Sequence, residues 1–348
     1  MKNLSDLFAA EFVKKTQVKP EFTFNKKISN LRTSVEQSTK PQLIDTVKTI
    51  LQLNAVPFAI DISQYKNAHS PDNPTGDYKA AYRLSRLADS VPIVTTYYTP
   101  SLNSTEKIWE NLIYGASTNA KYTNHLLSKA QQNCDTSKLV DMGGGLSGWL
   151  PVYTKPSNWY TLLDDEANLI DMEIDMVNGD TSNSDFLIVR GDKAISLDII
   201  KQDSTQKITF HKETQIKKIN LKVLCVEFIR PWLDFELFSL KNWKIEGLNS
   251  GYYSTGTLTN NQGIFPLVTQ SMLIGTKINL EGTFNKNDLE LIKSQITKKN
   301  HFSIGPFFLN TNNQKATINE VGYTTQIKSS LTQVIGYISN VVPTAPSI

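Results

Sequence analysis

The stretch Val223–Gly251, VLCVEFIRPWLDFELFSLKNWKIEGLNSG, specifies the fold more strongly than any other part of the chain. It begins as a β-type run that ends at Arg230-Pro231-Trp232-Leu233-Asp234, and it holds two of the five tryptophans, Trp232 and Trp243. Proline cannot donate a hydrogen bond to a sheet ladder, so Pro231 must lie at the end or the edge of a strand. The segment therefore predicts a corner at which a β-rich region closes.

The structural interpretation of this segment is a corner made of Arg230, Pro231, Trp232 and Asp234. The residue before a proline is biased to extended backbone, which suits Arg230 at a strand end. The guanidinium group forms a fork that matches a carboxylate, so we expect it to pair with Asp234 or Glu227. Apolar residues surround Trp232 and would anchor it in a core.

A functional interpretation of the same region also stays open. Trp232, Trp243, Tyr252 and Tyr253 would line a lipid- or sugar-binding surface, because amphipathic aromatic side chains favour such interfaces. Since Trp232 fits the core, Trp243, Tyr252 and Tyr253 remain as the candidate binding or assembly surface. Substitution of Trp232 would then unfold the β-rich region, whereas substitution of either tyrosine would affect binding.

The chain before residue 138 alternates helix-type and strand-type patterns. Apolar residues recur at helical spacing in several windows, and β-branched or aromatic runs separate them. The expected helices cover residues 4–15, 41–53, 77–90 and 104–133, the last being one helix or two that break near Gly115, and the expected strands cover 56–62 and 91–99.

The chain after residue 138 is dominated by short β-type runs with Asn, Gly, Asp and Thr clusters between them. Such spacing predicts an antiparallel, sandwich-like arrangement. The expected strands cover residues 186–190, 194–200, 207–211, 216–229, 263–271, 272–281, 301–309 and 326–342, and one short helix covers 287–299.

Together these patterns predict an α+β fold with a helix-rich, mixed N-terminal half and an antiparallel β-rich C-terminal half. A chain of 348 residues exceeds what one hydrophobic core usually covers, so two regions are expected. We place a mixed α/β region at residues 1–138 and a β-rich domain at residues 139–348.

Composition excludes several classes of protein. No window approaches 18 uninterrupted apolar residues, so no membrane-spanning helix is expected. The lysines and arginines are scattered without a reader motif, which disfavours nucleic-acid binding. Cys134 and Cys225 belong to no CxxC pair and are expected to be free thiols in a reducing compartment. We therefore predict a cytoplasmic protein, and release by a route without a cleavable signal stays open.

An acidic segment interrupts an otherwise slightly basic chain. Residues 151–200 hold 3 Lys/Arg against 10 Asp/Glu. In LIDMEIDMV the side chains of Asp171, Glu173 and Asp175 share one face if the segment is a strand. That face is either solvated, in contact with a protein, or a site for a divalent cation with oxygen ligands. The solvated face is favoured, although a helix over this segment also stays open.

Histidines give no indication of a catalytic or metal site. None of the four has a partner at i+2 or i+4 that would form a metal motif. A catalytic set assembled only in space has no fixed sequence spacing and stays open. We therefore assign no catalytic residue, metal ligand or cofactor. The four histidines are His69, His125, His211 and His301.

A set of short motifs resembles a family of bacterial and fungal proteins that has no assigned activity. The similarity covers mainly residues 140–348, and the motifs are specific as a set but weak singly. The resemblance implies one continuous structural unit and transfers no catalytic residue, cofactor or partner. The motifs are Arg230-Pro231-Trp232, Asn242-Trp243, the segment from Ser250-Gly251 to Ser254-Thr255-Gly256, Gly305-Pro306-Phe307, Ile335-Gly336-Tyr337-Ile338, Val342-Pro343 and Pro346.

The sequence favours a non-enzymatic, self-assembling or surface-binding protein that acts through its β-rich half as a homo-oligomer. Many short strands and the lack of a recognisable catalytic grouping support this expectation. One alternative is a hydrolase with a pocket in which at least two of Asp165, Asp171, Glu173, Asp175 and a histidine converge, with or without a divalent cation. A second is a membrane-interacting, toxin-like protein whose helix at residues 4–15 contacts lipid. A membrane or glycan surface as partner stays open.

Overall fold

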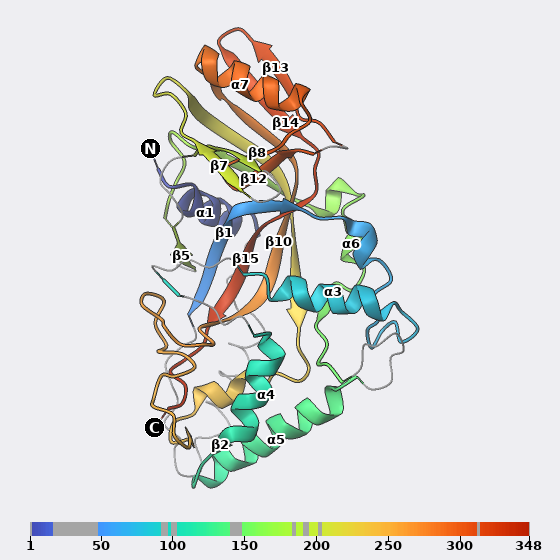
Figure 1. Ribbon diagram of the computed structural model, residues 1–348, viewed down its shortest axis with the longest axis vertical. Helices are drawn as coiled ribbons and strands as arrows, with labels where there is room; N and C mark the ends of the chain where they lie inside the picture. Colours follow the sequence, from blue (N-terminus) through green and yellow to red (C-terminus); the bar gives the residue numbers. More distant parts are fainter. Residues whose placement is uncertain are drawn as a thin grey trace.

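Two long antiparallel strands, β8 (Gln215–Ile229) and β10 (Leu267–Thr283), form the centre of an α+β fold (Figure 1). The expected fold class is thereby confirmed. The computed structural model describes residues 2–16, 48–91, 97–98, 103–139, 148–182, 186–190, 195–200, 204–311 and 314–347.

The two halves of β8 bury side chains in two different hydrophobic cores. Successive residues of a strand face opposite sides of a sheet, and the buried positions change from 219, 221 and 223 in the first half to 224, 226 and 228 in the second. Leu224, Val226 and Phe228 belong to one core. Ile219, Leu221 and Val223 belong to the other.

The main sheet extends from both edges of the β8–β10 pair. On the edge that faces away from β8, strand β10 pairs with β15 and with β14. Strand β15 also pairs with β1, β1 pairs with β5, and β14 pairs with β13. Strand β8 pairs with β3 and β4. Only the β1–β5 pair is parallel among the pairs in this sheet. The bounds are β1 Thr49–Ala59, β3 Tyr153–Lys155, β4 Ile170–Asp175, β5 Leu187–Val189, β13 Thr317–Val321, β14 Thr324–Ser329 and β15 Gln333–Val341.

Two smaller sheets complete the described strands. One is antiparallel and runs in the order β12-β11-β6-β7, and it contributes to the same core as Leu221 of β8. The other is the pair β2–β9. The bounds are β2 Ala116–Ser117, β6 Leu197–Ile200, β7 Thr205–Ile208, β9 Lys244–Ile245, β11 His301–Ile304 and β12 Phe307–Asn310.

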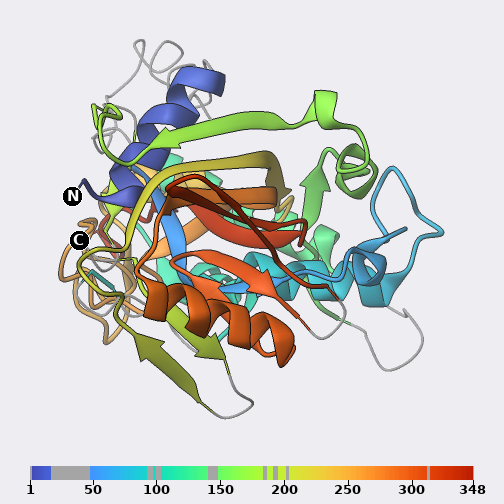
Figure 2. The same cartoon turned by 90° about the horizontal axis from the view of Figure 1, so that it is seen from above.

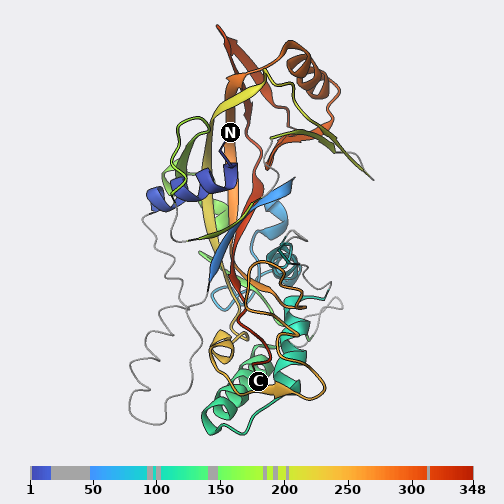
Figure 3. The same cartoon turned by 90° about the vertical axis from the view of Figure 1, so that its left-hand side faces the viewer.

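Helices cover the long strands from different sides. Figure 3 shows α1 on one side of these strands and α3 and α4 on the other. Seen from above, α1 and α7 lie at opposite margins of the molecule (Figure 2). The bounds are α1 Leu4–Thr16, α3 Tyr78–Ala88, α4 Thr105–Gly115, α5 Lys121–Ser137, α6 Trp159–Leu162 and α7 Lys286–Thr297, with short 3₁₀ turns η1 Ile62–Tyr65, η2 Glu166–Asn168 and η3 Phe235–Ser239.

Local sequence explains where α3 and α7 begin. The Asp77 side chain accepts a hydrogen bond from the Lys79 backbone N–H, which satisfies one of the free donors at the start of α3. Asn285 does the same for Asn287 at the start of α7, so the cap is Asn285 and Asn287 is already inside the helix. The expected helices at 77–90 and 287–299 are thus confirmed with small shifts at their ends.

The expected helix at residues 41–53 is wrong over its described part, because Thr49–Leu53 lies in β1. Residues 41–47 lie outside the described residues. Ile50 and Leu51 are both fully buried, so this strand is covered on both faces. A strand buried on both faces lacks apolar–polar alternation and can show apolar residues at helical spacing by chance.

Other predicted elements differ from the structure mainly in how the sequence runs divide into separate strands and helices. The runs at 263–271 and 272–281 are parts of one strand, β10, whereas the runs at 301–309 and 326–342 each form two strands. The long helical run at 104–133 is two helices, α4 and α5, and α4 ends at Gly115 as one of the two alternatives expected. The acidic segment forms a strand, β4, and not a helix.

The two expected regions share one sheet. Strand β1 comes from the first 138 residues and pairs along its length with β15 near the C-terminal end of the chain. One core combines Leu112 and Leu127 of the first region with Phe228 and Tyr337 of the second. A boundary at residues 138/139 therefore passes through a common core. Within the described ranges, no helix is both long enough and apolar enough to cross a bilayer.

Candidate functional site

Arg230 is a buried cation at the point where β8 ends. Its Nη1 donates to the Thr269 carbonyl at 2.5 Å, and its Nη2 donates to Thr269 Oγ1 at 3.2 Å. Nη2 also lies 3.7 Å from Asp89 Oδ1. Burial lowers the pKa of the guanidinium group, and the Asp89 carboxylate opposes that shift. Asp89, at the C-terminal end of α3, is therefore the ion-pair partner in place of the expected Asp234 or Glu227.

Asp89 connects this arginine to two helices. Its carboxylate accepts hydrogen bonds from the backbone N–H and the hydroxyl of Thr105, at 3.1 and 2.7 Å, and Thr105 is the first residue of α4. The Thr269 hydroxyl donates in turn to the Ala88 carbonyl in the last turn of α3. One ion pair thus joins the sheet to the end of α3 and the start of α4.

Trp232 completes the corner as a fully buried anchor. Its indole N–H donates to the Pro151 carbonyl at 2.6 Å, and its own carbonyl accepts from the indole N–H of Trp109 at 3.0 Å. Asp234 begins η3, where its side chain accepts from the Glu236 backbone N–H at 3.2 Å. These contacts agree with the structural interpretation of the segment Arg230–Asp234.

The predicted aromatic surface does not form from its three residues. Trp243 is 1% exposed and Tyr253 is 5% exposed, whereas Tyr252 is 45% exposed. The chain near the C-terminus covers the first two: Ser347 accepts from the Trp243 backbone N–H at 3.2 Å, and Ala345 accepts from that of Tyr253 at 2.8 Å. Trp243 and Tyr253 are therefore core residues, and only Tyr252 remains on the surface.

The acidic face of β4 points outward, and two lysines of the neighbouring strand β8 pair with two of its three carboxylates. Asp171 lies 2.6 Å from Lys222, and Glu173 lies 2.8 Å from Lys218. The Asp175 carboxylate instead accepts from two backbone N–H groups of the following turn, which lower its pKa. This arrangement agrees with the solvated face and removes the geometric basis for a hydrolase or a cation site on β4.

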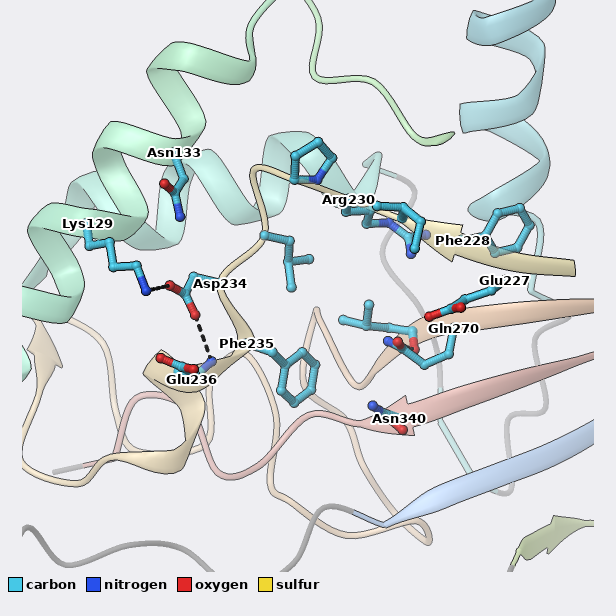
Figure 4. A pocket seen from close by; sticks show the side chains of 14 residues that line it. Lys129, Asn133, Glu227, Phe228, Arg230, Asp234, Phe235, Glu236, Gln270 and Asn340 are labelled. Atoms are coloured by element: carbon cyan, nitrogen blue, oxygen red, sulfur yellow. Dashed lines mark hydrogen bonds and ion pairs between the residues drawn. The ribbon is translucent and has the colours of Figure 1, made fainter. Parts of the chain in front are cut away.

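A cavity of about 360 Å³ opens beside the corner (Figure 4), and we call it the corner pocket. Helix α5 forms one wall, η3 forms a second, and the ends of β8, β10 and β15 form the third. The lining residues are Lys129, Asn133, Glu227, Phe228, Ile229, Arg230, Pro231, Leu233, Asp234, Phe235, Glu236, Val268, Gln270 and Asn340.

Amide side chains give the corner pocket unused hydrogen-bonding groups. Asn340 is 2% exposed; its Oδ1 accepts from the Thr49 hydroxyl at 3.1 Å, and its amide nitrogen has no partner among the described residues. Gln270 makes one long hydrogen bond, at 3.4 Å, to the Val268 carbonyl. Within the described chain, the side-chain amide of Asn133 makes no hydrogen bond. Buried polar groups such as Asn340 are normally paired, and Asn133 and Gln270 are half-buried beside it, so the three amides favour a polar ligand.

Charges in the wall of the corner pocket are largely compensated. Lys129 lies 3.5 Å from Asp234 across the gap between α5 and η3, and Figure 4 shows the two side chains pointing toward each other. Arg230 is held by Asp89 and Thr269, and its guanidinium carbon lies 5.7 Å from the centre of the Phe228 ring. Lys129 and Arg230 therefore each have a carboxylate partner, and neither presents an uncompensated positive charge to a ligand.

The sequence identified the corner but not the pocket beside it. The sequence pattern points to Arg230, Pro231 and Asp234. The other lining residues, among them Lys129, Gln270 and Asn340, are dispersed over the chain. One weak signal existed. Gln270 and Asn340 are amides inside largely apolar runs, LVTQSMLIG and YISNVV. A polar side chain in such a run costs free energy when buried unless it forms hydrogen bonds.

A second polar constellation links His211 to Asp288. The His211 ring Nδ1 lies 2.7 Å from Asp288 Oδ1, and Asp288 Oδ2 accepts from the His211 backbone N–H at 2.9 Å and the Thr214 hydroxyl at 2.5 Å. The carboxylate is 3% exposed. It clamps the turn before β8 onto the first turn of α7. The acidic residues of β4 are not part of this contact.

Other reactive groups do not gather into a site among the described residues. No group of three or more His, Cys, Asp or Glu side chains in that part of the chain is arranged to hold a metal ion. Cys134 and Cys225 are free, and burial raises the pKa of both thiols to about 11. At neutral pH both are therefore protonated and poor nucleophiles.

Comparison with known proteins does not add to this description. No family model matches the chain, and no curated protein or solved structure is significantly similar to it. The resemblance of residues 140–348 to a bacterial and fungal family therefore stays a prediction. Its motif residues do have structural roles, because Gly251 and Tyr253 donate backbone hydrogen bonds to Pro346 and Ala345.

The His211–Asp288 contact predicts a pH-dependent stability. The hydrogen bond to Asp288 raises the pKa of His211 above its ordinary value. Burial would raise the pKa of Asp288, but hydrogen bonds from Thr214 and His211 outweigh it and lower that pKa. The histidine contribution is complete below its unfolded pKa of about 6.5 and is lost as pH rises through its folded pKa. The carboxylate contribution is lost as pH falls through the folded pKa of Asp288, below about 3.9.

Urea unfolding of the wild type and of His211→Gln between weakly acidic and weakly alkaline pH measures this effect. The difference in free energy of unfolding between them should shrink as pH rises. His125→Gln, on the exposed side of α5, serves as the control and should show no such trend. An equal difference at every pH would contradict the clamp.

Proposed function

We propose that this chain is a non-enzymatic binding protein whose corner pocket takes a small polar ligand. The observation that carries the proposal is the set of amides, Asn133, Gln270 and Asn340, that face one cavity with unused hydrogen-bonding groups. Ligand cavities typically measure about 300–1,000 Å³ and combine apolar walls with a few placed polar groups. The corner pocket has both properties.

The rigidity of its walls supports binding at this site. Asn340 lies in β15 and is paired with both β10 and β1. Gln270 lies at the bulge of β10 between the paired residues Thr269 and Ser271, and Asn133 lies on a helix. Pro231 and the Asp234 cap fix the backbone that enters η3. Groups held on paired strands and helices keep their positions better than groups on loops, so less ordering entropy is lost when a ligand binds.

The composition of the wall favours binding over catalysis. No Ser, Thr, Cys, His or Tyr lines the cavity, so no hydroxyl, thiol or imidazole nucleophile is present in the described wall, and its acid–base groups are the carboxylates of Glu227, Asp234 and Glu236. Lys129 is paired with Asp234. The acidic face of β4 is neutralised by Lys218 and Lys222. In addition, Leu7, Phe8 and Phe12 of α1 are buried, so its apolar side is not presented to a membrane.

Thermal unfolding with a panel of polar small molecules tests the proposal. A ligand that binds only the folded state raises the melting temperature. We expect at least one chemical class among sugars, amino acids, polyamines, carboxylates and nucleotides to do so in the wild type, and the shift to be lost in Gln270→Met and Asn133→Leu.

The matched control is Gln132→Leu, which removes an exposed amide next to Asn133 on the same helix and outside the cavity. It should keep the shift. Two results would contradict the proposal: no class stabilises the wild type, or the stabilisation persists unchanged in both pocket variants.

Self-association through the β-rich half is a second candidate function. Among the described strands, β13 is the edge strand next to β14, and it lies at the end of the long axis remote from α5 (Figure 1). Val321 is 61% exposed and Tyr323 is 98% exposed at this hairpin. Glu320, the one charged residue of β13, is already paired with Lys293 of α7 at 2.5 Å. An open edge with few charges is a template for pairing with another strand.

Light scattering after size-exclusion chromatography tests this second candidate. We expect the mass of the wild type to rise with protein concentration, and Val321→Lys to remain monomeric, because a lysine at an edge opposes strand pairing. Tyr252→Lys, a comparable change at an exposed tyrosine outside this hairpin, should behave as the wild type. A strictly monomeric wild type would contradict self-association.

A further inference from the structure

We infer that the ligand of the corner pocket is a neutral sugar, a polyhydroxylated molecule of one or two rings. This inference rests on the proposed binding function and adds the chemical class of the ligand. It follows from which hydrogen-bonding groups the wall offers, how its charges are compensated, and where its apolar surface lies.

The buried amide of Asn340 requires a hydrogen-bond acceptor. Its Oδ1 is engaged by Thr49, so the amide nitrogen is the group directed at a ligand, and the residue is 98% buried. An ammonium or guanidinium group has donors only and offers nothing to this nitrogen. A simple cation that covered this nitrogen would leave it without an acceptor, which costs free energy.

Carboxylates on the same wall disfavour an anion. Glu227, Asp234 and Glu236 line the cavity, and a carboxylate accepts hydrogen bonds without donating any. Lys129 and Arg230 against the three carboxylates leave the wall with a net negative charge, and both cations already have carboxylate partners, so a phosphate or carboxylate ligand is disfavoured. A hydroxyl group donates and accepts at once, so it serves both the amides and the carboxylates.

The shape of the cavity also suits a sugar ring. Phe235, Leu233 and Val268 provide an apolar surface between the polar walls. Figure 4 shows the Phe235 ring standing between the side chains of η3 and those of Gln270 and Asn340. A pyranose carries C–H groups on its faces and hydroxyls around its rim. Its faces would contact the apolar surface while its hydroxyls reach the amides and carboxylates.

Saturation-transfer NMR and calorimetry with glucose, galactose, mannose and N-acetylglucosamine test the inference, with spermidine and citrate as charged probes. We expect at least one neutral sugar to bind, with an affinity that salt does not change, because screening acts on charges. Asn340→Leu and Gln270→Met should each weaken binding about tenfold, which corresponds to about 1.4 kcal/mol and lies within the range for one hydrogen bond. Gln132→Leu should bind as the wild type.

Each outcome has a distinct meaning. If spermidine or citrate binds in place of the sugars, with a salt-dependent affinity that Gln270→Met reduces, the sugar assignment is overturned and the binding function stands. If no probe binds, both the sugar and the binding function are contradicted. Asn340 is buried, and if Asn340→Leu does not fold, binding by Gln270→Met, a change at a half-buried residue, decides between these outcomes.

Discussion

The ion pair of Arg230 with Asp89, at the point where β8 leaves the sheet, is the interaction on which the rest of the structure depends. Thr269 holds the same guanidinium from β10, and Asp89 in turn holds the start of α4 through Thr105. A buried charge is costly unless it is paired and hydrogen-bonded, so this position tolerates few alternatives. The pairing therefore fixes the end of the sheet, α3 and α4 relative to one another.

The corner pocket is a consequence of that constraint. Once Arg230 is fixed, Pro231 ends the strand and Trp232 is held by the carbonyl of Pro151, so the chain must turn into η3. The cavity lies between η3, α5 and the strand ends. One ion pair in its wall has two effects. The Lys129–Asp234 pair joins α5 to η3 across the cavity, and it compensates the charge of Lys129 that a ligand would otherwise meet.

Sequence patterns could predict the elements that depend on local chemistry. β8 ends before Pro231, α3 starts at Asp77, and β4 alternates apolar and acidic residues, as expected. β1 could not be predicted because its Ile50 and Leu51 are buried on opposite faces and show no alternation. The partner of Arg230 is far away in sequence, and no local rule selects Asp89 over Asp234. The pocket was not predictable for the same reason, since its amides converge only in the folded chain.

A double-mutant cycle on Arg230 and Asp89 tests the central claim most directly, with the free energy of unfolding measured in urea. Arg230→Met should cost about 3–5 kcal/mol, because it leaves the Asp89 carboxylate without its cationic partner and the Thr269 carbonyl without its donor. Its effect should couple to that of Asp89→Asn by about 0.5–3 kcal/mol. Lys129→Met, which breaks the more exposed pair with Asp234, should cost less than about 1 kcal/mol. Additive effects at Arg230 and Asp89, or a cost for Arg230→Met no larger than for Lys129→Met, would contradict the account.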